Sequence, residues 1–160
     1  MIEPTHSNTI VGWREWVSLP GIGVPWIKAK IDSGAHSSAL HADHIEEFVG
    51  DDGNEWVRFH LKPWQNSDAD AAIVECAIHD RRAVRSSSGH REDRIAVLID
   101  VELGGHTVAA ETTLTNRDEM GFRMLVGREV LSQGFLVDSD KSFLGGRAPR
   151  DIRRRNQGRG

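Results

Sequence analysis

Apolar and polar residues alternate along several short stretches of this chain, with the two-residue period of β-strands. The alternation predicts strands over residues 9–17, 24–31 and 56–61. It also predicts three hairpins, which join residues 72–78 to 81–85, 95–103 to 106–114, and 135–138 to 141–144. The middle hairpin is the clearest, because Gly104 and Gly105 accept the positive φ angles of a two-residue turn.

The remaining patterned segments are short. Residues 124–127 form an apolar run that ends in glycine, which predicts a strand, and residues 128–133 predict a brief helix that Gly134 ends. Residues 37–44 fit either a short strand or one helical turn. Many short strands, one short helix and glycine-marked turns predict an all-β fold, either a closed barrel or a sandwich.

The length of 160 residues fits one domain. We expect a disordered N-terminus over residues 1–8, a single domain over 9–146 and a flexible arginine-rich tail over 147–160. The tail holds six arginines and one acid, so the rest of the chain carries 14 basic and 23 acidic residues. Such an acidic body is a poor general nucleic-acid binder.

Cysteine content and hydropathy set the expected location. Cys76 is the one cysteine, which rules out an internal disulfide. No uninterrupted apolar run approaches the roughly 20 residues needed to cross a bilayer, and no signal-peptide pattern is present. We therefore expect a cytoplasmic protein without a membrane partner.

The segment Lys30-Ile-Asp-Ser-Gly-Ala-His36 places an acid directly after a predicted strand. An Asp-Ser-Gly tripeptide arises by chance in about one chain of this size in ten, so its context matters more than its presence. The context here is ordered: a strand that leads into Asp32, then a hairpin, then the apolar-Gly-Arg run over residues 124–128. This order indicates a site in which Asp32 performs chemistry.

That layout resembles the retropepsins, and the chain is still more similar to retropepsin-like proteins named ATP-dependent zinc proteases, which are associated with a glutamate ligase that modifies a ribosomal protein. The similar stretches are residues 11–17, 28–35, 38–42, 84–91 and 114–128. Two positions depart from the family, since Ser33 stands where threonine is more usual and His36 where arginine is common. The resemblance implies a retropepsin-like, acid-protease barrel.

Aspartic-protease chemistry needs two carboxylates that share one proton around a water molecule. This chain offers one Asp-Ser-Gly, so the second carboxylate is expected from a twofold-related copy, in a homodimer. In this reading Asp32 is the catalytic carboxylate, Ser33 bonds across the interface and Gly34 lets the backbone approach the water. The reaction is hydrolysis of peptide or polyglutamate-like amide bonds, without a cofactor or metal.

Arginines in the loops around the expected site predict an acidic, glutamate-rich substrate, because guanidinium groups pair well with carboxylates. Residues 86–89 are read as a turn that forms either a flap tip, an anion-binding nest or a plain loop. The predicted substrate-binding residues are Arg85, Ser87, Arg91, Arg117 and Arg123. Further partners that the resemblance implies are a glutamate ligase or a ribosomal protein.

Two other functions stay open. The first is a zinc-dependent hydrolase that uses a histidine cluster drawn from His36, His41, His44, Cys76 and His79. The second is a non-catalytic accessory module that binds a glutamate ligase or the ribosome through its arginine tail. A direct role of ATP has no support in the sequence, because no phosphate-binding Gly-x-x-x-x-Gly-Lys-Ser/Thr loop is present.

Overall fold

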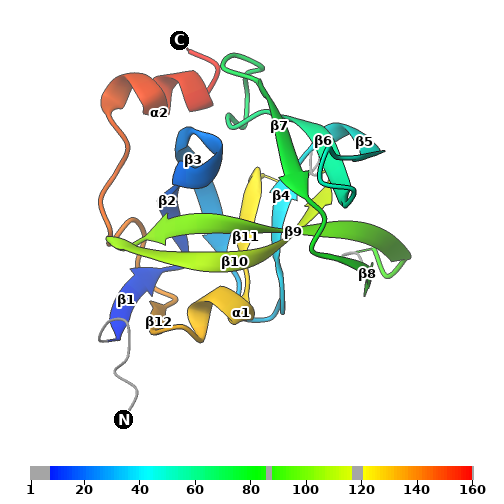
Figure 1. The fold of residues 1–160 in the computed structure, drawn as a ribbon. Helices are drawn as coiled ribbons and strands as arrows, with labels where there is room; N and C mark the ends of the chain where they lie inside the picture. The colour runs from blue at the N-terminus through cyan, green and yellow to red at the C-terminus, as the bar shows by residue number, and fades with distance from the viewer. Residues whose placement is uncertain (1–7, 86–87, 117–120, 160) are drawn as a thin grey trace.

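The computed structural model of this chain describes residues 8–85, 88–116 and 121–159. Within these ranges the chain forms mostly short strands (Figure 1). In chain order the elements are β1 (Thr9–Gly12), β2 (Arg14–Leu19), η1 (Pro20–Ile22), β3 (Val24–Ile31), β4 (Ser38–His41), β5 (Asp43–Val49), β6 (Glu55–Leu61), β7 (Ala72–Ala77), β8 (Asp80–Arg85), β9 (Arg91–Leu103), β10 (His106–Thr115), β11 (Met124–Val126), α1 (Arg128–Leu131), β12 (Phe135–Asp138) and α2 (Arg150–Asn156).

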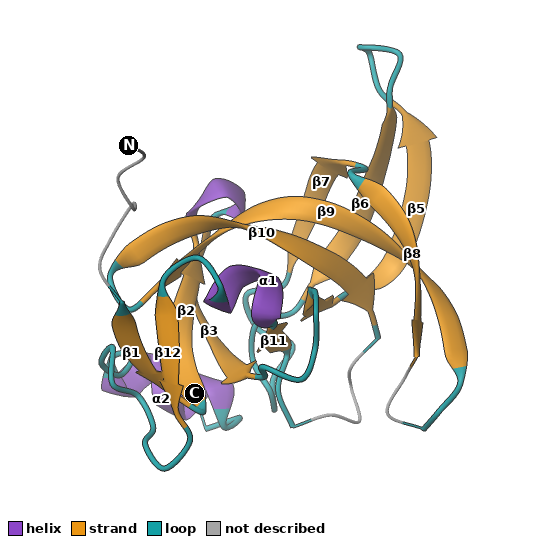
Figure 2. Cartoon of the chain, turned by 90° about the horizontal axis from the view of Figure 1, so that it is seen from below, coloured by secondary structure: helices purple, strands orange, loops and turns teal. Residues whose placement is uncertain are grey.

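The largest sheet closes on itself, because β9 pairs with both β10 and β2. Its order is β10-β4-β11-β3-β2-β9, and β8 adds to β9 as an extension. Seen from below, the strands form a ring with α1 lying across its middle (Figure 2). β11 is central to the ring, since it pairs in parallel with β3 and antiparallel with β4. The predicted all-β fold is confirmed.

Alternate residues of the ring fill its interior. Val17 on β2, Ile27 on β3, Leu40 on β4 and Val97 on β9 are all at most 1% exposed and belong to one apolar cluster. Because side chains of a strand alternate between its two faces, the intervening residues point outward. The interior is thus a packed core, and the outer face of β2 and β3 is left for other elements to cover.

One predicted hairpin is confirmed and two are wrong. β9 and β10 pair in register around Gly104 and Gly105, which have φ angles of 57° and 84°. β7 and β8 do not pair with one another: β7 pairs with β6, and β8 with β9. The amide of His79, which joins them, bonds to the carbonyl of Ala96, so the chain passes here from one sheet to another.

The hairpin predicted over residues 135–144 is the second error. β12 pairs in parallel with β1, at the other end of the chain, and the two make a separate two-stranded sheet. Residues 141–143 instead follow β2, with the amide of Phe143 bonded to the carbonyl of Arg14. A short polar turn in the sequence does not reveal that the preceding strand has a partner far away in the chain.

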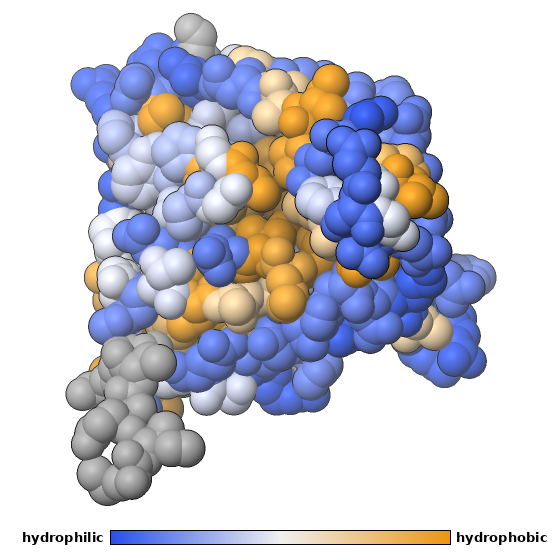
Figure 3. All heavy atoms as spheres, viewed as in Figure 1, coloured by the Kyte–Doolittle hydropathy of each residue, from blue (hydrophilic) through white to orange (hydrophobic). Residues whose placement is uncertain are grey.

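A third sheet, β5-β6-β7, stands beside the ring. The strand prediction missed β5, because its sequence Asp-His-Ile-Glu-Glu-Phe-Val is mostly exposed and lacks alternation. Between this sheet and the ring lies a groove of about 400 Å³, to which Ile22, Ile78 and Leu98 contribute. Figure 3 shows an apolar area in the middle of the same face, and Leu98 is 52% exposed.

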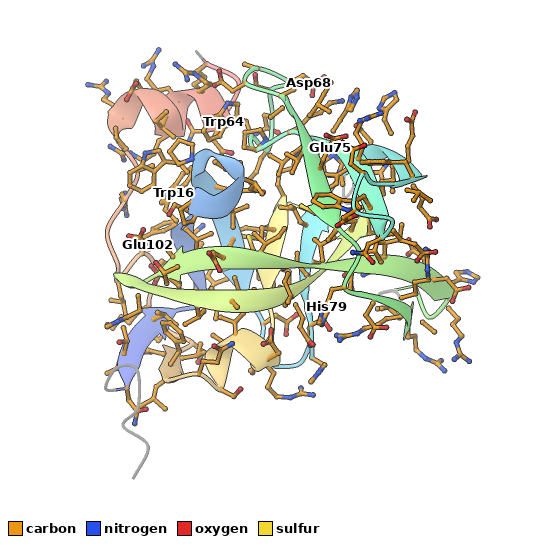
Figure 4. The ribbon with its side chains drawn as sticks, viewed as in Figure 1. Trp16, Trp64, Asp68, Glu75, His79 and Glu102 are labelled. Atoms are coloured by element: carbon orange, nitrogen blue, oxygen red, sulfur yellow. The ribbon has the colours of Figure 1, made fainter. Side chains whose placement is uncertain are left out.

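Residues 147–160 were predicted to be flexible, but residues 150–156 form helix α2. The helix and the segment before it contribute Ala148 and Ile152 to a second apolar cluster, around Trp16 and Trp64. Figure 4 shows these two tryptophans between α2 and the ring. Asn156 is 2% exposed; its side-chain oxygen accepts a bond from the backbone amide of Gln65, and its side-chain amide donates to the side-chain oxygen of Gln65. A few anchoring contacts therefore order a segment whose composition alone indicates disorder.

None of the helices in the described part of the chain combines the length and the apolar character that crossing a membrane requires.

Candidate functional site

Asp32 follows the last residue of β3 and begins the loop that leads to β4. Its amide donates to the carbonyl of Val126 on β11, at 2.9 Å, which fixes the start of the loop against the ring. Its carboxylate Oδ1 accepts a bond from the amide of Gly34, also at 2.9 Å. A Cβ atom on Gly34 would lie 3.1 Å from the same oxygen, so glycine permits this close approach. The loop thus presents a carboxylate in a defined position.

Helix α1 supports this loop from below. The amides of Arg128 and Glu129 donate to the carbonyls of Ala35 and His36, at 2.7 and 2.9 Å. The guanidinium of Arg128 reaches further and donates to the carbonyl of Ser33, at 3.0 Å. Arg128 therefore ties the Asp-Ser-Gly turn to the helix directly.

Gly127 explains how α1 comes so close to the loop. A Cβ atom at this position would lie 2.5 Å from the carbonyl oxygen of Ser37, a distance at which backbone atoms would have to move. The amide of Gly127 also donates to the hydroxyl of Ser38 on β4, at 3.1 Å. The apolar-Gly-Arg run of the sequence is thus one structural unit, in which the glycine allows the contact and the arginine fixes the turn.

Asp32 faces an open cavity of about 1300 Å³. Its walls come from the β3–β4 loop and from the β8–β9 hairpin, and they are rich in basic side chains. The lining cations and histidines are Lys30, His36, Arg82, Arg85, His90, Arg91 and Arg94. The positive potential that these groups produce favours an anionic ligand.

Among the described residues, the carboxylates of Asp32 and Glu92 line the cavity, and they differ in their surroundings. Glu92 accepts a bond from the hydroxyl of Thr115, at 3.1 Å, and pairs with Arg94, at 3.2 Å. Asp32 has no ion-pair partner among the described residues, and it is partly exposed to the cavity. Asp32 is accordingly the carboxylate of this cavity that is open to a water molecule or a ligand.

Arg82 is held in the cavity wall by contacts to two other elements. It donates to the hydroxyl of Ser37, at 2.6 Å, and pairs with Glu111 on β10, at 3.0 Å. The hydrogen bond from Arg82, aided by one from His79, keeps the pKa of Glu111 below its ordinary value, although partial burial opposes this. This arginine joins β8, the β3–β4 loop and β10 at one point.

Eight site residues were predicted from the sequence, and four of them line the cavity: Asp32, Gly34, Arg85 and Arg91. Ser33 lies in the same loop as Asp32. Arg123 does not line the cavity: it is 7% exposed, and its guanidinium donates to the carbonyls of Trp64 and Gln65. Ser87 and Arg117 lie outside the described residues.

Sequence reasoning missed Lys30 and Arg82 as parts of the site. Lys30 follows the alternation of β3, so the strand assignment already indicates that it shares a face with Lys28. Arg82 could not be found in this way, because the prediction paired β8 with β7 and not with β9. Its place beside Asp32 depends on the register in which Arg82 faces Arg94.

The proposed histidine cluster is dispersed in the structure. His36 lines the Asp32 cavity, His41 is buried on β4, and His79 pairs with Glu111 at 3.2 Å. Cys76 lines the small groove, where burial raises the pKa of its thiol. A thiol so placed is a weak metal ligand, since the metal binds the thiolate.

His44 instead lies with residues that the sequence did not connect to it. The potential ligand atoms of Asp43, His44 and His60 lie within 4.8 Å of one another, the one such group found in the described part of the chain. The imidazole rings of His44 and His60 stack at 4.5 Å. Lys62 pairs with the Asp43 carboxylate at 3.0 Å and competes with any cation there. None of these residues lines the Asp32 cavity.

The chain is similar in sequence to known proteins. It is 46% identical over 139 residues to a protein of Shewanella halifaxensis named "Probable alpha-L-glutamate ligase", and 44% identical over 133 residues to one of the same name from Parasynechococcus marenigrum. These alignments cover 87% and 83% of this chain but only 30% and 28% of the relatives. The chain therefore spans about a third of the length of the curated relatives that it matches.

A solved structure shows the same fold. Lpg0085, a Legionella pneumophila protein described as of unknown function, superposes with a TM-score of 0.73 and 26% identity over 87% of this chain and 99% of its own. The family model RimB-like, described as "Retropepsin-like aspartic endopeptidase RimB", matches residues 10–148. That range includes the Asp32 loop, the β8–β9 hairpin and α1. This chain belongs to the RimB-like family of retropepsin-like aspartic endopeptidases.

Proposed function

We propose that this chain is an aspartic peptidase that hydrolyses amide bonds in acidic, glutamate-rich polypeptides, with Asp32 as its catalytic carboxylate. The observation that carries the proposal is the position of Asp32. Its carboxylate lies in a glycine turn at the edge of a 1300 Å³ cavity, without an ion-pair partner among the described residues. A carboxylate held in this way can take a proton from water, which a salt-bridged one does poorly.

The reaction needs a second carboxylate, and we assign it to Asp32 of a second copy of the chain. One carboxylate takes a proton from water, whose oxygen attacks the amide carbon, while the other donates its proton to the carbonyl oxygen. The first carboxylate then gives the proton that it took from water to the nitrogen as the carbon–nitrogen bond breaks, and the second recovers a proton from a hydroxyl of the intermediate, so that the product acid and the amine leave. Glu92 is a poor substitute for the second group, because Thr115 and Arg94 already bind it.

The choice of an acidic substrate follows from the cavity walls. Arg85 and Arg91 are exposed at the end of the β8–β9 hairpin, and Lys30 lies beside Asp32. Guanidinium groups bind carboxylates with two parallel hydrogen bonds, which fixes both the position and the charge of the ligand. We expect glutamate-rich peptides to be cut before neutral or basic peptides of equal length.

The variant Asp32→Asn tests the assignment. The amide oxygen of asparagine can still accept the bond from Gly34, so the loop keeps its shape, but the group can no longer exchange a proton. We expect turnover of a glutamate-rich peptide to fall to background while the circular dichroism spectrum stays that of the native chain. Turnover near the native level in Asp32→Asn would overturn the proposal. It would favour either a metal site or a non-catalytic role beside a glutamate ligase, the activity named in the curated relatives.

The group of Asp43, His44 and His60 supports a second candidate function, a zinc-dependent hydrolase. His44 has a φ angle of 51°, and the β5–β6 register shifts between Asp43 and Glu46. Backbone strain of this kind often accompanies functional sites. An aspartate pair activates water without a Lewis acid, so our primary proposal predicts that dialysis against a chelator leaves turnover unchanged.

The matched variant for this test is His60→Asn, which removes a potential ligand far from the Asp32 loop in sequence. If chelation and His60→Asn both abolish turnover, and added zinc restores the native enzyme only, the zinc hydrolase is the correct function. If neither treatment affects turnover, the aspartic mechanism stands.

A further inference from the structure

Three cations meet on the outer face of β2 and β3, away from the cavity walls described above. The guanidinium of Arg14 lies 4.9 Å from the ring centre of Phe143, that of Arg147 lies 5.2 Å from it, and the ammonium of Lys28 lies 5.6 Å from it. Arg14 comes from β2, Lys28 from β3 and Arg147 from the segment before α2. We refer to Arg14, Lys28 and Arg147 as the cation cluster.

Within the part of the chain that the structure describes, no carboxylate forms an ion pair with any of the three members of the cation cluster. Burial lowers the pKa of Lys28, and repulsion from Arg14 and Arg147 lowers it further. Another arginine that lies against a phenylalanine ring does have a carboxylate partner. Arg58, 5.0 Å from the ring of Phe48, pairs with Glu75 at 2.7 Å.

A cluster of this kind costs free energy in the unbound chain, because like charges that lie close together repel. An anion that binds there relieves the repulsion and gains from all three cations. The aromatic side chains Trp13 and Phe143 hold the cations in place, Arg14 also lying 4.7 Å from the ring of Trp13. The hydroxyl of Ser142 accepts a bond from Arg14 at 3.1 Å, so this guanidinium is already oriented.

The position of the cation cluster points to its ligand. Arg14 and Lys30 face each other in the β2–β3 pair, and Lys30 also lines the Asp32 cavity. Residues opposite one another on antiparallel strands have Cβ atoms about 5 Å apart. Lys30 therefore connects the cation cluster to the cavity, and a single extended chain can contact both.

A polypeptide fits this surface better than a nucleic acid does. Proteins that bind single strands offer exposed aromatic faces on which bases stack. Here the cations cover the ring of Phe143, which is only partly exposed. The surface thus offers charge without a stacking platform, which suits carboxylates.

We propose that Arg14, Lys28 and Arg147 form a second anion-binding site, which holds a carboxylate-rich segment of a polypeptide whose neighbouring segment occupies the Asp32 cavity. The identity of the bound chain as substrate rests on the proposed peptidase function, but the binding itself does not. The site gives the enzyme a preference for long acidic chains over short ones, because only a long chain contacts both regions.

Binding is measured with the full chain carrying Asp32→Asn, so that the probe is not cut, and with a fluorescently labelled oligoglutamate. In this background Arg147→Gln and Lys28→Gln are each expected to weaken binding about tenfold, the size of one charge-assisted contact. Arg58→Gln is the matched control, since it removes an equivalent arginine on a phenylalanine that carboxylates already neutralise. It is expected to leave the affinity unchanged.

An oligouridylate of equal charge is the second probe. The proposed anion-binding site would be refuted if all variants bound oligoglutamate with equal affinity. It would also be refuted if the chain bound oligouridylate but not oligoglutamate. In the catalytically intact chain, Arg147→Gln is expected to raise the KM of a long oligoglutamate and to leave that of a short acidic peptide unchanged. If the native chain shows no turnover but binds oligoglutamate in a way that depends on Arg147, the proposed peptidase function is refuted and the proposed binding site stands.

Discussion

Arg128 shows at the scale of one residue how the sequence motif works. In the sequence, this arginine ends the apolar-Gly-Arg run over residues 124–128. The structure shows what it does, because its guanidinium donates to the carbonyl of Ser33, inside the Asp-Ser-Gly turn. The side chain thus fixes the backbone that carries Asp32 without contacting the carboxylate.

We predict that Arg128→Gln lowers kcat by about tenfold to a hundredfold, since a small displacement of a reacting group has effects of this size. The KM for an acidic peptide is expected to change little, because Arg128 does not line the cavity. Arg154→Gln, on the exposed side of α2, is the control. The kinetics of both variants are measured. A native kcat in Arg128→Gln, or a rise in KM alone, would contradict the role of Arg128 in positioning Asp32.

Local signals were enough to locate Asp32 and Gly34 at the end of a strand, where the structure places them on the cavity wall. Asp32 and Gly34 follow β3, whose alternation is clear in the sequence, and their placement needed no knowledge of distant contacts. Arg123 was wrongly expected in the cavity, because a buried guanidinium that binds two backbone carbonyls looks in sequence like any loop arginine. The role of Arg123 depends on its contacts with Trp64 and Gln65, which lie far from it in the chain.

At the scale of elements, the predictions failed where a strand had an unexpected partner. The β9–β10 hairpin was predicted correctly, because two glycines mark its turn. The hairpin over residues 135–144 was wrong because β12 pairs with β1, far away in the chain, and β8 pairs with the strand after it, β9, and not with β7. Composition likewise missed α2, whose order comes from a few contacts to Trp64, Gln65 and Asp70.

Asp70 makes the attachment of α2 dependent on pH. The indole of Trp64 donates to its carboxylate at 2.9 Å, and Arg155 of α2 pairs with it at 2.9 Å. The hydrogen bond from Trp64 has the largest effect and lowers the pKa of Asp70; burial raises it in part, and the contact with Arg155 lowers it again, so that the net shift is downward. Because the folded value is the lower one, this carboxylate stabilises the fold above its unfolded pKa, and the effect is lost as the pH falls through the folded pKa.

We therefore predict that Asp70→Asn unfolds at a lower urea concentration than the native chain at neutral pH, and that this gap closes in strong acid. Asparagine tolerates the positive φ angle of 59° at this position, so the backbone is not strained by the change. Asp68→Asn is the control, as it removes an exposed acid two residues away. A gap that stayed constant down to low pH would show that Asp70 acts through something other than its charge.

At the scale of the whole molecule, the sheet of β1 and β12 offers an apolar surface to a second copy. Among the described strands these two pair only with each other, and they expose Ile10, Leu136 and Val137, at 57%, 53% and 37%. Unpaired strand edges with apolar side chains favour association with another chain. Helix α1 lies between this sheet and the Asp32 loop, with contacts to both.

We predict that the specific activity falls on dilution, as dimers separate and the second carboxylate is lost. Ile10→Glu is expected to shift the chain toward monomers and to lower activity in parallel. Ile73→Glu, which changes a similarly exposed isoleucine on β7, is expected to do neither. Sedimentation of the same samples gives the oligomeric state, and full activity in a proven monomer would contradict a shared active site.

Arg82 has a mechanical consequence for access to the cavity. It clamps β8 to Ser37 in the β3–β4 loop and to Glu111 on β10, and thus fixes the root of the β8–β9 hairpin on two sides. Arg82 therefore holds the β8–β9 pair in place at this point, while Arg85 and Arg91 lie further along the pair and are exposed. A carboxylate that enters the cavity from this end would meet two arginines whose positions the contacts of Arg82 do not fix.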